Sequence, residues 1–197
     1  MRVDPPPIAA SNLVHQEGVL AVIALIGLTI RDRSPLLGLS ARGEIWQGLG
    51  FGLAVGCGAA GALWLAHRLR FFEELEAWQS SLLVKWTPAD AVIVAIFSGL
   101  AEEALLRALV QPLVGIVPAA VGFALLHLLP DRRLWMWPVI AFFMGLAFGL
   151  LFEKFGFPAA AVAHIALNMV GLLRLTSARR DSADADTSVK STSDSDS

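Results

Sequence analysis

Six apolar segments follow one another along this chain, and they leave it few ways to fold. They are residues 18–30, 45–66, 89–111, 116–129, 134–152 and 158–173. The chain of 197 residues is 56% hydrophobic and 16% charged, with a mean hydropathy of +0.65, which is typical of membrane proteins. We therefore predict an all-α, polytopic transmembrane helix bundle of about six spans, the first of which is marginal in length.

The apolar segments divide the chain into four parts. Residues 1–17 are a polar segment, residues 18–88 hold two membrane helices and an interfacial stretch, and residues 89–175 hold a core of four helices. Short connections within this core predict that neighbouring helices are antiparallel. Residues 176–197 are rich in Ser, Asp and Thr, and they have too few apolar side chains to offset their ordering entropy. We predict that this tail is disordered.

A glycine-rich run in the second segment predicts one close helix contact. Gly48, Gly52 and Gly56 are spaced four apart, so they form a flat ridge on one helix face. Such a ridge indicates packing and says nothing about chemistry. Cys57, the single cysteine, lies in the same run, so the chain has no internal disulfide. We expect its thiol to be buried and inert.

The charges bear on partners and on orientation. A net charge of -2 and the lack of a basic stripe give no electrostatic reason to expect a nucleic acid. With six spans, ten Lys and Arg residues lie on the side of both termini and four on the other, which predicts a multi-pass protein of the cell membrane with cytoplasmic termini. The ten are Arg2, Arg68, Arg70, Lys85, Arg132, Arg133, Arg174, Arg179, Arg180 and Lys190, and the four are Arg31, Arg33, Arg42 and Lys154.

Three polar patterns interrupt the apolar segments of the core. They are Glu102-Glu103-x-x-x-Arg107, Phe123-x-x-x-His127 and His164-x-x-x-Asn168. An ionisable group at the centre of a bilayer costs about 2.5 to 3.5 kcal/mol even on the gentler insertion scales. Such groups are functional by default, and we interpret them as parts of one site.

Helical geometry separates the two glutamates of the first pattern. Glu103 and Arg107 are four residues apart, so they share a helix face and can form an ion pair that fixes this helix. Glu102 points elsewhere, about 140° around the helix from Arg107. We therefore expect Glu103 and Arg107 to support the site and Glu102 to face a cavity.

The predicted depths of the patterns agree. At 1.5 Å per residue, Glu102 lies about 15 Å and His127 about 18 Å from the hairpin turn that joins their helices. His164 and Asn168 lie about 12 Å and about 18 Å from the same membrane side. Polar groups from three helices should therefore meet in one layer.

These groups together suit the hydrolysis of a carbonyl compound. A carboxylate that is removed from water is an effective general base, so Glu102 with His127 could activate a water molecule. His164 and Asn168 share a helix face and could donate hydrogen bonds to a developing oxyanion. Within a membrane, the obvious carbonyl is a peptide bond of a membrane-associated peptide or protein.

The three patterns, in this order and spacing, resemble the CPBP family of CAAX proteases and bacteriocin-processing intramembrane endopeptidases. The resemblance covers residues 89–175. It implies a glutamate-dependent intramembrane protease, in which the positions of Glu102 and His127 activate water and those of His164 and Asn168 hold the oxyanion. Many members have an aromatic residue before the arginine and a glycine after it, where this chain has Leu106 and Ala108. The difference concerns local packing and substrate preference more than the chemistry.

Other interpretations stay open at this point. Two histidines and a glutamate also suit a catalytic zinc site, although the His-Glu-x-x-His pattern of many zinc proteases is absent. We expect no cofactor, with zinc as the alternative. Ser98 lacks the sequence context of a serine nucleophile. A transport protein or a non-catalytic immunity protein could carry the same residues. The sequence indicates neither the substrate nor the oligomeric state.

Overall fold

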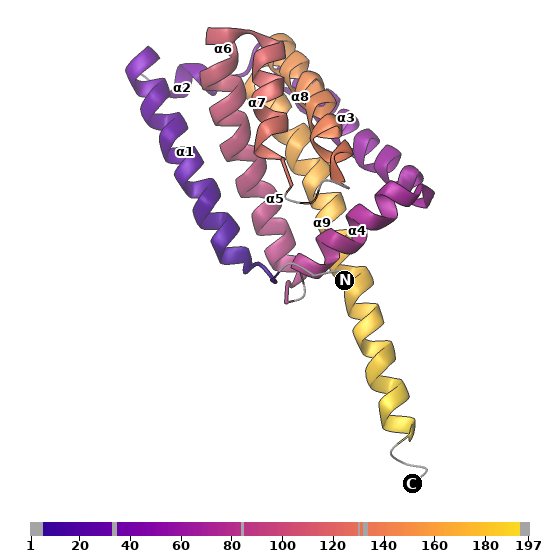
Figure 1. The fold of residues 1–197 in the computed structure, drawn as a ribbon. Coiled ribbons are helices and arrows are strands. Elements are labelled where there is room, and N and C mark those ends of the chain that lie inside the picture. The colour runs from indigo at the N-terminus through magenta and orange to yellow at the C-terminus, as the bar shows by residue number, and fades with distance from the viewer. Residues whose placement is uncertain (1–5, 33–34, 84, 130, 132–133, 194–197) are drawn as a thin grey trace.

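In the computed structural model, the described residues are 6–32, 35–83, 85–129, 131 and 134–193. They form a bundle of helices, and within these ranges no β-strand is present (Figure 1). The predicted all-α membrane bundle is confirmed. Four arginines used to predict the orientation, Arg2, Arg33, Arg132 and Arg133, lie outside the described residues.

Four helices in the described part of the chain are long and apolar enough to cross a membrane, and they span residues 10–32, 45–68, 136–155 and 157–177. The other two predicted spans are also helical. One is a continuous run formed by α5 (Pro88–Glu103), the π-helix η2 (Ala104–Val110) and α6 (Gln111–Val114). The other is α7 (Ile116–Leu126), which ends three residues before the predicted segment does.

The helix α9 (Phe157–Ser193) lies at the centre of the bundle. It packs against α3 (Ile45–Leu65), α5 and α8 (Met136–Phe155). The helix α1 (Ala10–Asp32) lies at the outer edge along α5, as Figure 1 shows, and it contacts the π segment. The short α2 (Pro35–Gly38) follows α1, and the amphipathic α4 (Arg70–Leu82) follows α3 through the 3-10 turn η1 (Ala66–Arg68).

Local signals begin and end the core helices. Thr87 and Asp90 form a reciprocal capping box at the start of α5, with Pro88 in the first turn. The turns into α7 and α9 are made by Gly115 and Gly156, whose φ angles of 90° and 84° lie in a region that other residues rarely adopt. The resulting hairpins are antiparallel, as the short connections predicted.

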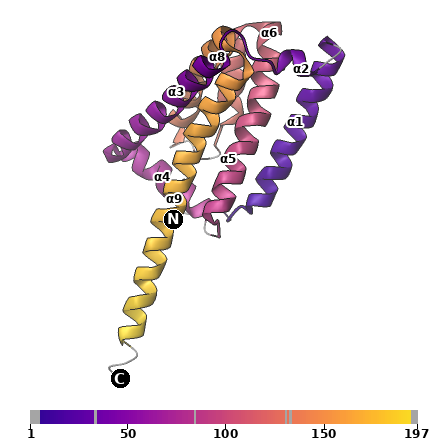
Figure 2. The same ribbon diagram turned by 180° about the vertical axis from the view of Figure 1, so that it is seen from behind.

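The glycine ridge of α3 packs against α9, seen from behind in Figure 2. A Cβ atom at Gly52 would collide with the carbonyl oxygen of Ala159, and one at Gly56 with that of Ala163. The predicted close contact is therefore confirmed. Cys57, next to Gly56, is exposed, so the prediction of a buried thiol is wrong. The reason is that the ridge faces α9 and the following residue points away from it.

The two ends of the chain differ from their predicted boundaries. The first helix begins at Ala10 and not near residue 18, so part of the predicted polar segment is helical. At the other end, α9 continues to Ser193, through most of the tail predicted to be disordered, and Figure 1 shows this extension leaving the bundle. A helix that is already nucleated in the bundle gains one backbone hydrogen bond per added residue, which accounts for the extension.

Candidate active site

Glu103 is the centre of the buried polar network. Its Oε2 accepts a hydrogen bond from Arg107 Nε at 3.0 Å, and its Oε1 lies 2.9 Å from His164 Nδ1. Glu103 and Arg107 are fully buried and His164 nearly so. One carboxylate therefore bridges α5, the π segment and α9 in the middle of the bundle. The ion pair predicted from the spacing of Glu103 and Arg107 is present.

The π segment presents Arg107 within the bundle. A π turn leaves backbone carbonyls without their usual helical partner, and such turns are frequent at functional sites. Arg31, at the end of α1, donates from Nη1 to the carbonyl oxygens of Ala108 and Leu109 at 2.8 and 3.0 Å. The Arg107 guanidinium lies 5.2 Å from the centre of the Phe123 ring, and its Nη1 and Nη2 atoms have no hydrogen-bond partner in the part of the chain that the structure describes.

Glu102 is in a different situation from Glu103. Glu102 is buried, with 7% exposed, and its Oε2 is fully buried with no hydrogen-bond partner among the residues that the structure describes. A buried carboxylate oxygen without a partner is costly and is rare in folded proteins. Glu102 also interacts electrostatically with His164, Glu103 and Arg107, so it belongs to the same cluster. The two neighbouring glutamates thus differ, because Glu103 is hydrogen-bonded through both oxygens and Glu102 has an oxygen without a partner among the described residues.

His127 caps the end of α7. Its Nδ1 lies 2.8 Å from the carbonyl oxygen of Phe123. A carbonyl only accepts, so Nδ1 carries the hydrogen, and in a neutral ring Nε2 is then the acceptor. The Phe123 ring contacts the rings of both His127 and His164, at centroid distances of 4.5 and 5.4 Å. His127 interacts electrostatically with His164 and Glu103, so it borders the cluster across the Phe123 ring.

Asn168 has a partner that the sequence did not indicate. Its Nδ2 donates to Ser98 Oγ at 2.9 Å, which joins α9 to α5 one helical turn from His164. One of the two amide hydrogens of Asn168 is thus used within the protein, and the second is left for another acceptor. Ser98 is therefore a positioning residue for Asn168, a role that differs from the serine nucleophile considered above.

The structure brings most of the predicted residues together. Glu102, Glu103, Arg107 and His164 form one cluster, with His127 and Asn168 at its edges. Two neighbours were not predicted: Ser98, and Phe148, whose ring stacks on His164 at 5.2 Å. Within the described ranges, no three His, Cys, Asp or Glu side chains are arranged to hold a metal ion.

Comparison with protein families finds a match over this part of the chain. Residues 84–170 match the family described as "Type II CAAX prenyl endopeptidase Rce1-like". The match includes all three polar patterns. The match supports the membership of this segment in the CPBP family. No curated protein and no solved structure matches the chain.

The matched segment, called the CPBP core from here on, runs from just before α5 through Val170 in α9. The membership indicates a peptidase that acts on peptides or proteins in a membrane. Both α1 and α3 lie outside the core, although α1 packs on α5 and the π segment and α3 packs on α9. The CPBP core is thus enclosed by helices that the family match does not cover.

Proposed function

We propose that this protein is an intramembrane endopeptidase in which Glu102 activates the attacking water. The observation that carries the proposal is the contrast between the neighbouring glutamates. Glu103 is bonded to both Arg107 and His164, whereas Glu102 has a buried oxygen without a partner beside them. A general base must keep a free lone pair within reach of the water that it deprotonates.

In the proposed reaction Glu102 acts twice, first as a general base and then as a general acid. Glu102 takes a proton from water, and the water oxygen attacks the peptide carbonyl, which becomes a tetrahedral oxyanion. His127 accepts a hydrogen bond from the same water through Nε2. When the intermediate collapses, the C–N bond breaks and Glu102 returns the proton to the leaving amine. Atoms and charge balance without a metal or another cofactor.

The oxyanion requires donors in a site that excludes water. Glu103 engages Nδ1 of His164, so Nε2 is the ring nitrogen that faces a second group. As a donor there, His164 is an imidazolium, and the Glu103 carboxylate is its counter-charge. The second amide hydrogen of Asn168 is the other proposed donor, and Ser98 fixes the orientation of that amide.

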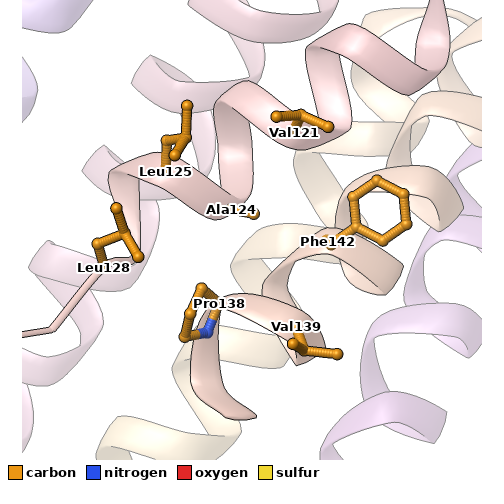
Figure 3. A pocket seen from close by; sticks show the side chains of 7 residues that line it. All are labelled: Val121, Ala124, Leu125, Leu128, Pro138, Val139 and Phe142. Atoms are coloured by element: carbon orange, nitrogen blue, oxygen red, sulfur yellow. The ribbon is translucent and has the colours of Figure 1, made fainter. Parts of the chain in front are cut away.

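An apolar groove on the α7–α8 helix pair suits a hydrophobic part of the substrate. It has a volume of about 280 Å³ and lies between α7 and the start of α8, as Figure 3 shows. Its walls are Val121, Ala124, Leu125, Leu128, Pro138, Val139 and Phe142. The matched family is named for a prenyl endopeptidase, and a prenyl chain is one group that such a groove could hold. We further propose that the protein lies in the cell membrane with cytoplasmic termini.

The test is cleavage of a membrane peptide library by the purified full chain in lipid vesicles. Glu102→Gln should lower cleavage by about 100- to 10,000-fold, which is the usual contribution of general base catalysis. Glu44→Gln is the matched control, because Glu44 is exposed on the loop before α3. Full activity of the Glu102→Gln variant would refute the proposal that Glu102 activates the water.

Two further arms separate the alternatives. A strong chelator should leave cleavage unchanged, and a loss that zinc restores would favour a metalloprotease. If the folded wild-type protein cleaves no member of the library, a non-catalytic role as an immunity or transport protein becomes the better interpretation.

A further inference from the structure

Glu17 is a buried carboxylate that the proposed mechanism does not use. It lies in α1, outside the CPBP core, and only 6% of the residue is exposed. Its Oε2 is fully buried and has no hydrogen-bond partner within the described ranges. Like Glu102, it carries the desolvation cost of an unsatisfied acceptor in an apolar interior. No ion pair offsets that cost among the described residues.

The register of three helices places Glu17 about one helical turn from the level of Glu102, on the side where α1 and α5 begin. One apolar cluster lies at the end of the bundle where α1 and α5 begin, and it includes Leu13 of α1, Val94 of α5 and Leu172 of α9. One helical turn further into the bundle, the same helix faces present Glu17, Ser98 and Asn168. We call these three residues the Glu17 layer.

The next turn of α5 and α9 leads to the proposed catalytic residues. Four residues beyond Ser98 is Glu102, and four residues before Asn168 is His164. Glu17 interacts electrostatically with both Glu102 and His164, so the Glu17 layer adjoins the catalytic cluster directly. Ser98 and Asn168 are bonded to each other, which leaves Glu17 as the unpaired member of its layer.

The charges around Glu17 indicate what kind of ligand would complete the layer. The charged groups that act on Glu17 electrostatically are another carboxylate, Glu102, and His164, which is already hydrogen-bonded to Glu103. A carboxylate that is ionised only accepts hydrogen bonds, so its natural partner is a cation with N–H donors. An N–H donor suits Glu17 better than a metal ion, because Ser98 and Asn168, the other two members of its layer, are a hydroxyl and an amide that are already hydrogen-bonded to each other.

We propose that Glu17 recognises a positively charged group of the substrate, the ammonium of a lysine or the guanidinium of an arginine close to the bond that is cleaved. This inference rests on the proposed endopeptidase activity. A cationic side chain that enters the membrane interior loses its hydration, and a buried carboxylate offsets that loss. Glu17 therefore selects such peptides over neutral ones, and it does so from a helix outside the CPBP core.

The test compares peptides that differ at one position. Starting from a library peptide that the wild-type protein cleaves, each position within four residues of the cleaved bond is in turn made Lys, Arg, Gln, Leu or Glu. At one position, kcat/KM for the Lys or Arg peptide should exceed that for the Gln peptide by about 30-fold, the scale of a desolvated charge pair. Glu17→Gln should reduce this ratio to about 1 to 3. Glu44→Gln should leave it unchanged.

A charge reversal provides a second variant. Glu17→Lys should invert the preference, so that the Glu peptide is cleaved faster than the Lys peptide. If it does not fold, Glu17→Gln still decides the question through the ratio. An unchanged ratio in Glu17→Gln overturns the proposal, as does an equal loss for all peptides, which would make Glu17 part of the chemistry or of the fold.

The outcome also separates this inference from the proposed function. If wild-type protein cleaves peptides in a Glu102-dependent way but shows no cationic preference at any position, only the role of Glu17 falls. If Glu102→Gln retains full activity, the mechanism falls, whatever the peptide preference. If nothing is cleaved, both proposals fall together.

Discussion

Replacing Glu103 by glutamine tests whether one carboxylate holds the bundle together. The wild-type carboxylate accepts from Arg107 through one oxygen and contacts His164 through the other. Glutamine has nearly the same shape, but only one of its two terminal atoms accepts, and the other is a donor. Glu103→Gln therefore keeps one of the two contacts at most. It also removes the charge of the one carboxylate that is hydrogen-bonded to the buried Arg107 among the described residues, while the Nη atoms of Arg107 already lack partners there.

The size of the effect follows from these two losses. Losing one hydrogen bond to a charged group costs about 1.5 to 3 kcal/mol. Removing one partner of a buried ion pair costs about 3 to 5 kcal/mol. The contact that glutamine keeps, to Arg107 or to His164, offsets part of that cost. We expect Glu103→Gln to lower the free energy of unfolding by about 3 kcal/mol, or about 100-fold in the unfolding equilibrium.

The assay is reversible unfolding in mixed micelles with increasing SDS, followed by the fluorescence of the six tryptophans. Glu74→Gln is the matched control, because Glu74 pairs with the exposed Arg70 at 3.7 Å. Such surface pairs contribute about 0 to 1 kcal/mol. A loss for Glu103→Gln that equals the loss for Glu74→Gln would refute the reasoning. Replacing both charges, with Glu103→Leu and Arg107→Met, should be less damaging than Glu103→Leu alone.

Two glycine substitutions test the packing around α9, by the same unfolding assay. Gly56→Ala should lower the free energy of unfolding by about 1 to 3 kcal/mol, because the new methyl group meets the carbonyl of Ala163. Gly58 has open space beside it, so Gly58→Ala should be neutral or stabilising by up to about 1 kcal/mol. Equal effects at the two positions would contradict the α3–α9 contact. Gly156→Ala should lower the free energy of unfolding by about 1 to 3 kcal/mol, because the φ of 84° favours glycine and the new Cβ would lie 2.7 Å from Arg42 N. An unchanged unfolding midpoint would be evidence against that turn.

The sequence predicted the bundle and most of the candidate site, because both depend on helical periodicity. The spacing of Glu103 and Arg107 was enough to predict their ion pair, since residues four apart meet on any α-helix. The Gly48, Gly52 and Gly56 ridge was predictable for the same reason. Counting residues from the turns also brought Glu102 and His164 to one level, and they do interact.

Contacts between elements that are distant in the sequence could not be predicted in this way. The bond from Asn168 to Ser98 depends on the rotation of α9 against α5, which periodicity does not fix. The π segment is equally hidden, because its carbonyls are satisfied by Arg31 from another helix. Glu17 was missed because the first helix was expected to begin after it. The pattern Leu13, Val14, Glu17, with spacings of three and four, was the available signal that this residue faces inward.

The turn at Gly156 has a consequence for the modularity of the protein. Residues 40–42 lie across this turn: the Arg42 amide donates to Phe155 O at 2.8 Å, and the Phe157 amide donates to Ser40 O at 3.2 Å. Backbone hydrogen bonds thereby join the loop that precedes α3 to the last hairpin of the CPBP core, and α3 itself packs along α9. The family boundary at residue 84 is therefore not a boundary of folding. A fragment cut there would lose the loop that fixes its own last turn, so we expect the N-terminal helices and the CPBP core to unfold together.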